Sequence, residues 1–355
     1  MKYLLLLAGV FMGWSLGTND ASSAFGTAVA ARVIKYRTAV IIIAIFVILG
    51  AFISGSHNLT SISELAVSNK VIASDDAIEA AVSDGSEASL ALKSAIKASI
   101  IFFCAGLTVF VMTCLKMKVS SNQSIAGAII GWGLFHADYT DPQVLAVNLP
   151  QIGKFFLTWI LNPVGAAAIS FALVFLANKF LITRLTKLAG YDKLIKIGYL
   201  VAGAFASYSI GMNSAANVTA LYYDHINDGV TTNLLTDARL TATIGGLAIA
   251  LGVLTFSKRV MMAVGTSIAQ LSQIEGFLVI IAMALTIVLM GTFMGIPVSI
   301  SQALIGAIVG AGLVKSPKNV NFKILRNIAI SWVSSPLVAG ILTYLAAWAT
   351  KSVLS

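Results

Sequence analysis

Two polar elements, far apart in the sequence, carry residue types that could bind a cation. Residues 17–20 read GTND and residues 211–214 read GMNS, and each element follows an apolar run. Carboxylate, amide and hydroxyl oxygens are hard ligands that suit a small cation. Helix capping is the alternative, because Asn and Asp are strong caps. The second copy favours ion binding, and the predicted cation ligands are Asn19, Asp20, Asn213 and Ser214.

Two serine clusters could bind an anion. Residues 119–123 read VSSNQ and residues 298–302 read VSISQ, and a glycine-spaced apolar stretch follows each. The N-terminus of a half-helix presents free N–H groups and a dipole that favour anions, and serine hydroxyls add donors. Tight helix packing is the alternative reading. The predicted anion ligands are Ser120, Ser121, Asn122, Gln123, Ser299, Ser301 and Gln302, with the two glutamines bridging to the cation site.

A third pattern recurs in the same order, WILNP at 159–163 and WVSSP at 332–336. Three matched patterns indicate an internal duplication. The first Asn element leads toward basic residues and the second toward acidic residues, so the halves are predicted to face opposite ways. Inverted repeats of this kind are typical of secondary transporters, with the binding site near the membrane midplane. We predict a first transmembrane repeat at 1–190 and a second, inverted one at 191–355.

The elements that must position these residues are apolar spans. The chain has 355 residues, 58% hydrophobic and 10% charged, whereas soluble domains carry about 25% charged residues. A soluble enzyme is therefore excluded, and the fold class is an all-α polytopic membrane protein with broken or re-entrant helices. The predicted spans are 3–16, 38–56, 96–115, 152–183, 197–212, 238–256, 276–295 and 327–350, with shorter apolar segments at 120–135 and 299–314. Pro163 and Pro336 are candidate breaks within two spans.

The net charge of +9 comes from basic residues between the apolar runs, so it indicates membrane topology and no nucleic-acid partner. Basic residues cluster at 32–37, 116–118, 179–196 and 258–259, whereas loop 57–95 is acidic. The positive-inside rule predicts a multi-pass cell-membrane protein whose N-terminus and acidic loop lie outside and whose loop 179–196 is cytoplasmic. Residues 315–326 do not fit this scheme cleanly.

The middle of the apolar runs shows no clear Lys or Arg. A dehydrated anion would then need dipoles and a co-bound cation to balance its charge, and such mutual dependence is the thermodynamic basis of symport. His57, His136 and His225 are dispersed, and we find no P-loop, nucleophile elbow or zinc pattern. The sequence therefore predicts no enzyme, no catalytic residue and no cofactor beyond a coupling cation.

These residues resemble the inorganic phosphate transporter (PiT) family, which is marked by a duplicated Gly-x-Asn-Asp element. Residues 17–27 are similar to its first copy and residues 211–220 to its second, and the similarity reaches both ends of the chain. The resemblance implies a cation-coupled phosphate symporter with an all-helical inverted-repeat fold, with phosphate at the serine clusters and cations near the Asn elements. Ser214 replaces the usual second aspartate, Ala220 a glycine, and Asn122 and Ile300 replace threonines.

We therefore predict a phosphate importer that works by alternating access in symport with a cation. Sodium is favoured because an oxygen cage can hold it without a titrating group, and proton coupling through Asp20 stays open. The rival substrates are sulfate and other oxyanions, since the family has a sulfate permease branch. The rival from another class is a passive channel or a nutrient-sensing receptor. The sequence leaves ion stoichiometry and oligomeric state open, with a homodimer as one option.

Overall fold

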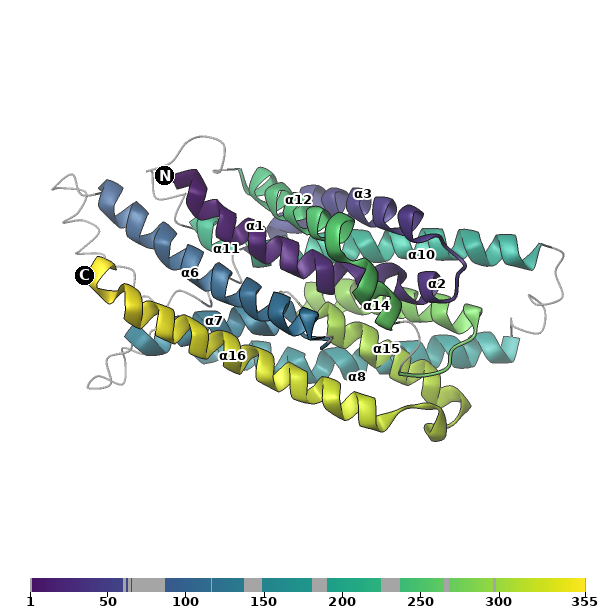
Figure 1. Cartoon of the computed structure of the whole chain (residues 1–355). Coiled ribbons are helices and arrows are strands. Elements are labelled where there is room, and N and C mark those ends of the chain that lie inside the picture. The colour runs from purple at the N-terminus through teal and green to yellow at the C-terminus, as the bar shows by residue number, and fades with distance from the viewer. Residues whose placement is uncertain are drawn as a thin grey trace.

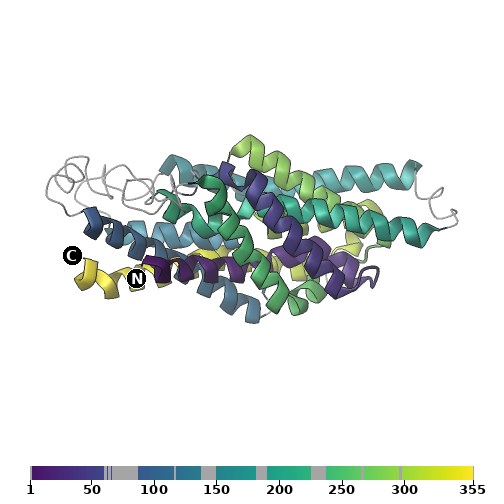
Figure 2. The same ribbon diagram turned by 90° about the horizontal axis from the view of Figure 1, so that it is seen from above.

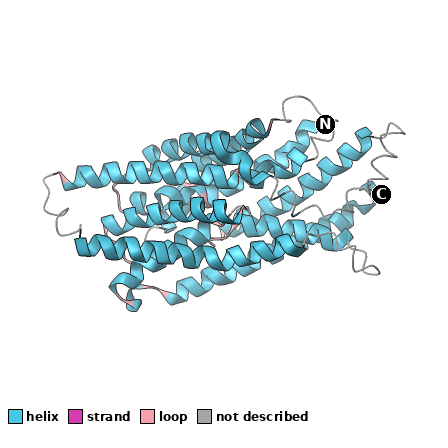
Figure 3. Ribbon diagram, turned by 180° about the vertical axis from the view of Figure 1, so that it is seen from behind, coloured by secondary structure: helices cyan, strands magenta, loops and turns pink. Residues whose placement is uncertain are grey.

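The computed structural model describes residues 2–59, 62, 65, 87–115, 117–136, 149–180, 190–224, 237–264, 268–295 and 298–354. Over these residues the chain is helical, and the single extended pairing is an antiparallel bridge between Ala269 and Val320. The long helices lie alongside one another in an elongated bundle, and both termini lie at the same end (Figures 1 and 2). The view from behind shows the same helical bundle (Figure 3). The predicted all-helical architecture is confirmed.

The helices follow one another along the chain with short connections at several points. In order they are α1 (Lys2–Asn19), η1 (Ala21–Phe25), α2 (Gly26–Ala30), α3 (Tyr36–Ser54), η2 (Gly55–Asn58), α6 (Glu87–Cys114), α7 (Ser121–His136), α8 (Leu149–Phe180), α10 (Tyr191–Ser214), α11 (Ala216–Asp224), α12 (Ala238–Phe256), α13 (Lys258–Val264), α14 (Gln273–Met294), α15 (Ile300–Lys315), η3 (Pro317–Asn319) and α16 (Phe322–Leu354).

Seven stretches of the described chain are long and apolar enough to cross a membrane. They are Tyr36–Ser54, Ala95–Cys114, Leu149–Phe180, Tyr191–Tyr222, Ala238–Phe256, Gln273–Gly291 and Phe322–Lys351. Each corresponds to a predicted span; the eighth predicted span forms α1, which is helical but is not one of these seven. The chain is thus a multi-pass membrane protein.

The two candidate proline breaks are wrong as helix ends. Pro163 lies inside α8 and Pro336 inside α16, and both helices continue past the proline. Membrane helices tolerate proline because neighbouring helices pack against the site and local adjustments satisfy the freed backbone groups. Here a glycine of a neighbouring helix packs against the carbonyl of each proline. Gly306 of α15 lies against Pro163, and Gly127 of α7 lies against Pro336.

Glycines on the two short helices α7 and α15 set how closely they pack. A Cβ placed on Gly127 of α7 would lie 2.2 Å from the carbonyl oxygen of Pro336, and one on Gly306 of α15 would lie 2.2 Å from that of Pro163. One turn further along, Gly131 and Gly310 meet backbone carbonyls of the same partner helices. Small residues allow such close approach of helix backbones. The packing pattern is therefore the same in both halves.

The helices α7 and α15 lie toward opposite ends of the bundle. The far end of α7 lies near the C-terminal part of α16, where the rings of Phe135 and Tyr344 are 5.4 Å apart. The far end of α15 lies near the start of α14, where the Lys315 ammonium is 2.7 Å from the Glu275 carboxylate. Each helix has 16 residues, about 24 Å at 1.5 Å per residue, too short to cross a ~30 Å bilayer core unaided.

The charged segment 315–326, which did not fit the predicted topology, lies at the same end as other basic residues. The Asn321 N–H donates to the Ile268 carbonyl at 3.0 Å, just after α13. At the start of α13, the Ser257 hydroxyl is 3.1 Å from that of Tyr36, next to the basic residues 32–37. Most of the acidic loop 57–95 and residues 181–189 of the basic loop lie outside the described residues.

Candidate ion and anion site

The Asp20 carboxylate joins the first polar element to both serine clusters. Asp20 lies between α1 and η1 and is 1% exposed. It accepts a hydrogen bond from the Ser121 hydroxyl, and the Ser301 hydroxyl lies 2.5 Å from its Oδ1 atom. Ser121 opens α7, and Ser301 lies in the first turn of α15. The carboxylate thus brings three segments, separated by about 100 and 180 residues, to one buried point.

The outer serines of the two clusters cap the short helices. The Ser120 hydroxyl accepts from the Gln123 N–H at 3.3 Å, and the Ser299 hydroxyl accepts from the Gln302 N–H at the same distance. A serine in this position satisfies one free N–H of a helix start. The two helices therefore begin at the same buried centre, with their remaining N-terminal N–H groups and dipoles aimed at it.

The second polar element lies against the second serine cluster. The Asn213 amide donates to the Val298 carbonyl at 2.8 Å and accepts from the Val298 N–H at 2.9 Å. Its nitrogen also donates to the Ser214 hydroxyl at 3.3 Å. In the first half the situation differs, because both polar side-chain atoms of Asn19 are buried and lack a hydrogen-bond partner among the described residues.

Several other buried polar atoms around this centre also lack a partner within the described part of the chain. They are Asn122 Nδ2, Gln123 Oε1, Asn162 Oδ1, Asn217 Oδ1 and Gln302 Oε1, and Ser335 Oγ of α16 is likewise buried without a partner. Buried polar groups are rarely left unpaired, so a cluster of them indicates a place for ligands. The set contains carbonyl and hydroxyl oxygens for a cation and N–H or O–H donors for an anion.

Asn162 was not among the predicted site residues, and Asn217 was only a weaker candidate for the cation site. The Asn162 amide of α8 donates to the Ser299 carbonyl at 2.7 Å, and the Asn217 amide of α11 donates to Asn122 Oδ1 at 2.6 Å. The signal for Asn162 was its place in the third repeated pattern, where Ser335 is its counterpart. Asn217 was the next polar residue along the second Asn element.

The prediction that no basic side chain lies inside the apolar region is wrong. Lys118 is 9% exposed, and its ammonium donates to the Asn19 carbonyl at 2.5 Å and to the Ser23 hydroxyl at 2.9 Å. Lys118 follows an apolar run and lies two residues after Lys116. This pattern is typical of a basic loop outside the membrane, so nothing in the sequence indicates that Lys118 is buried. The chain turns inward after α6, and this turn brings Lys118 to the buried centre.

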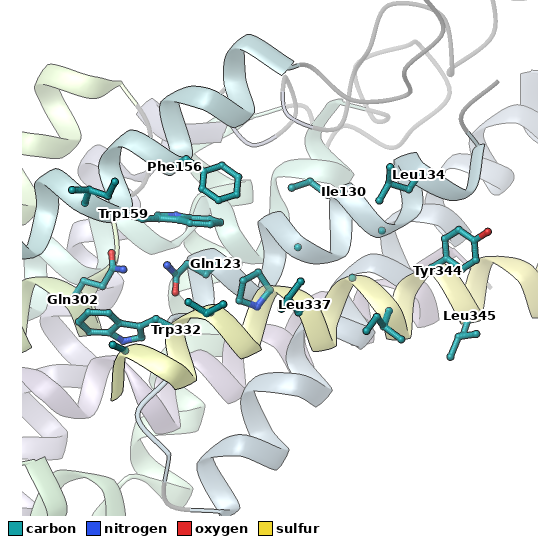
Figure 4. Close-up of a pocket in the computed structure, with 18 residues that line it drawn as sticks. Gln123, Ile130, Leu134, Phe156, Trp159, Gln302, Trp332, Leu337, Tyr344 and Leu345 are labelled. Carbon is teal, nitrogen blue, oxygen red and sulfur yellow. The ribbon is translucent and has the colours of Figure 1, made fainter. Parts of the chain in front are cut away.

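An apolar groove lies beside the polar centre, with a volume of about 690 Å³, lined by α7, α8 and α16 and by Gln302 of α15. Figure 4 shows Gln123 and Gln302 at one end of it next to Trp159 and Trp332, while Tyr344 lies at the other end. The two glutamines therefore border both the groove and the polar cluster. The two tryptophans come from the third repeated pattern.

A bundle of apolar helices around a buried polar centre, where short helices from opposite ends begin, defines a membrane transporter. The sequence model of the phosphate transporter family matches residues 16–193 and again residues 186–343. The chain therefore belongs to the phosphate transporter family, and it is a transporter rather than an enzyme. The two successive matches also support an internal repeat.

Individual relatives agree with this assignment. The chain is 26% identical to a candidate phosphate permease of Pyrococcus abyssi, over 96% of this chain and 95% of that protein. It is 27% identical to the sulfate permease CysP of Bacillus subtilis, over 97% and 87% of the two chains. A solved structure of a sodium-dependent phosphate transporter has the same fold, with a TM-score of 0.77, 23% identity and 99% and 98% coverage.

Proposed function

We propose that this protein imports inorganic phosphate in symport with a cation, with sodium as the favoured ion. The observation that carries the proposal is the buried Asp20 carboxylate held between serine hydroxyls of the two short helices. The family assignment supports phosphate as the substrate. The structural relative is a sodium-dependent transporter, and this likeness supports sodium as the coupling ion.

The anion is held where α7 and α15 begin. The hydroxyls of Ser120, Ser121, Ser299 and Ser301, the side chains of Asn122, Gln123 and Gln302, and nearby backbone N–H groups are its ligands. The positive ends of two helix dipoles meet there, which favours binding of an anion. Transporters that bind anions at discontinuous helices use the same arrangement.

The cation is held by Asp20, with Asn19, Asn213 and Ser214 as further oxygen ligands. Asp20 shares the serine hydroxyls that the anion needs, and each hydroxyl has a single proton to donate. When the hydroxyls donate their hydrogen bonds to the anion instead, the Asp20 carboxylate loses its donors and requires a cation in their place. Binding of each solute thus favours binding of the other, which is the coupling that symport requires.

The matched packing of α7 on α16 and of α15 on α8 supports two inverted repeats around a site near the membrane midplane. Rocking of one group of helices against another around this site would expose it alternately to each side. The division into 1–190 and 191–355 stays a prediction, as does a homodimer. The helix pairs of α7 with α16 and α8 with α15 each contain one helix from either half, so the two repeats interlock.

The serine hydroxyls can be tested one at a time. Ser121→Ala and Ser301→Ala should each raise the KM for phosphate by about tenfold or more, because a hydrogen bond to a charged group contributes about 1.5–3 kcal/mol. Ser207→Ala is the matched control, since this buried hydroxyl donates to the Gly203 carbonyl of its own helix. An unchanged KM in both site variants, measured by phosphate uptake into proteoliposomes, would remove the serines from the anion site.

We propose that one end of the bundle is cytoplasmic, as the positive-inside rule requires. This end carries the basic residues of 32–37, 257–259 and 315–326. The exposed Lys318 and Lys351 lie just before and near the end of the long helix α16. With Cys104 and Cys114 replaced by alanine, Lys351→Cys should react with a membrane-impermeant maleimide in intact cells. Lys318→Cys should react only after permeabilisation. The reverse pattern of labelling would contradict this orientation.

Sulfate is the second candidate substrate, because a sulfate permease is among the relatives and the serine clusters carry Asn122 and Ile300. Both anions are tetrahedral, but phosphate is protonated near neutral pH and sulfate is not. The acceptor atoms Gln123 Oε1, Gln302 Oε1 and Asn162 Oδ1 lack partners among the described residues and could receive a phosphate O–H. Excess sulfate should therefore compete weakly with labelled phosphate; strong competition would favour the sulfate reading.

A further inference from the structure

Lys118 is a buried charge that the proposed transport cycle does not use. Its ammonium contacts the carbonyl of Asn19, the last residue of α1, and the hydroxyl of Ser23 in η1. None of the described carboxylates lies within 4.0 Å of it, although Asp20 is the residue that follows Asn19. A buried charge is costly unless other groups compensate for it, so its position needs an explanation.

The groups around the ammonium are those that a mobile cation would take. The C-terminal end of a helix carries free carbonyls and a partial negative charge. Discontinuous transporter helices use these carbonyls, with nearby hydroxyls and carboxylates, to coordinate a coupling ion. Lys118 therefore places a covalently attached positive charge where α1 presents a cation position.

The second half of the chain offers the comparison. The repeated patterns align Lys118-Val119-Ser120 with Pro297-Val298-Ser299, and Asn19-Asp20 with Asn213-Ser214. The first half thus has a carboxylate and an ammonium, and the second half has neither. The helix end at Asn213 and Ser214 receives no Lys or Arg contact among the described residues. The two differences balance in charge, because the first half gains one negative and one positive group near the same helix end.

We propose that the Lys118 ammonium takes the place of one coupling cation, so that each phosphate is carried with one cation fewer than the oxygen ligands alone would require. The inference rests on the proposed symport. The tethered charge occupies the Asn19 carbonyl and Ser23 hydroxyl throughout the cycle, and mobile cations bind the remaining ligands near Asp20, Asn213 and Ser214. Because Lys118 is not released, it contributes to anion binding but not to the charge that crosses the membrane.

The test measures the ratio of labelled sodium to labelled phosphate taken up by proteoliposomes. Lys118→Gln should raise this ratio by about one cation per phosphate, because a mobile ion must now replace the buried charge. Lys118→Arg keeps the charge and should leave the ratio unchanged. A Lys118→Gln protein that transports phosphate with the wild-type ratio would overturn the inference.

A second readout does not depend on transport. Sodium should raise the unfolding temperature of purified Lys118→Gln or Lys118→Met more than that of the wild type, because each variant gains a sodium site that binds the folded state. Equal sodium-induced shifts would overturn the inference. If wild-type vesicles show no sodium-dependent phosphate uptake, the proposed symport fails, while this comparison still shows whether removing the ammonium creates a cation site.

A third variant retains the lysine and so tests the site even if the buried charge is needed for folding. Ser23→Ala removes one ligand of the ammonium. If Lys118 fills this position, the half-saturating sodium concentration for phosphate uptake should not change, because no mobile ion binds Ser23. A several-fold weaker sodium dependence in Ser23→Ala would show that a mobile cation uses this hydroxyl and would overturn the inference.

Discussion

Asp20→Asn should reduce sodium-coupled phosphate uptake on the order of 100-fold or more, because removing one partner of a buried ion pair costs about 3–5 kcal/mol. The carboxylate is buried and holds hydroxyls from both short helices. Asparagine keeps the size of the side chain but removes its negative charge, so the site loses its strongest cation ligand. The measurement is the initial rate of phosphate uptake into proteoliposomes under an inward sodium gradient.

The matched control is Asp192→Asn, which removes an exposed carboxylate in the first turn of α10. This variant should transport at the wild-type rate, because surface charges far from the site contribute little. Full sodium-dependent uptake by Asp20→Asn, at equal amounts of reconstituted protein, would remove Asp20 from the mechanism. The cation would then have to be held by uncharged oxygens alone.

Gly306→Ala should destabilise the protein by about 1–3 kcal/mol, as overpacking of a close-packed contact does. The added Cβ would meet the Pro163 carbonyl at 2.2 Å, and neither backbone can move without shifting α15 away from α8. Gly127→Ala should have the same effect, since its Cβ would meet the Pro336 carbonyl at the same distance. Thermal unfolding of the purified protein in detergent measures the loss.

Gly153→Ala is the control for this pair, because a Cβ on Gly153 of α8 has nothing within 4 Å among the described residues. Its unfolding temperature should match that of the wild type. If only one of Gly127→Ala and Gly306→Ala lowered the unfolding temperature, the two contacts would not be equivalent. That result would contradict the matched packing that supports the inverted repeats.

The sequence predicted the helical class and which segments meet, because both follow from local patterns. Long apolar runs specify spanning helices, and short glycine-spaced runs after serine clusters predicted α7 and α15. Repetition of Asn19-Asp20 and of the serine clusters indicated that they share a site, and the Asp20 contacts with Ser121 and Ser301 bring the first Asn element and both serine clusters together. Their roles as ligands stay predictions.

The sequence could not predict features that depend on the path of the chain. Pro163 and Pro336 were predicted as helix breaks. Whether a proline ends a membrane helix depends on the partner helix that packs against it, and here both helices continue. Lys118 was predicted to lie in a loop, because the order of residues along the chain does not show that the chain turns inward after α6. Asn162 read as part of a repeat, and only its bond to the Ser299 carbonyl places it at the site.

Uphill movement of phosphate together with a cation is tested most directly by uptake into proteoliposomes with sodium and pH gradients imposed separately. We expect accumulation above the external phosphate concentration with an inward sodium gradient, and little with a pH gradient alone. Accumulation driven by the pH gradient alone would replace sodium with a proton. Equilibration without any gradient would indicate a channel, and no flux would indicate a receptor; either result would contradict symport.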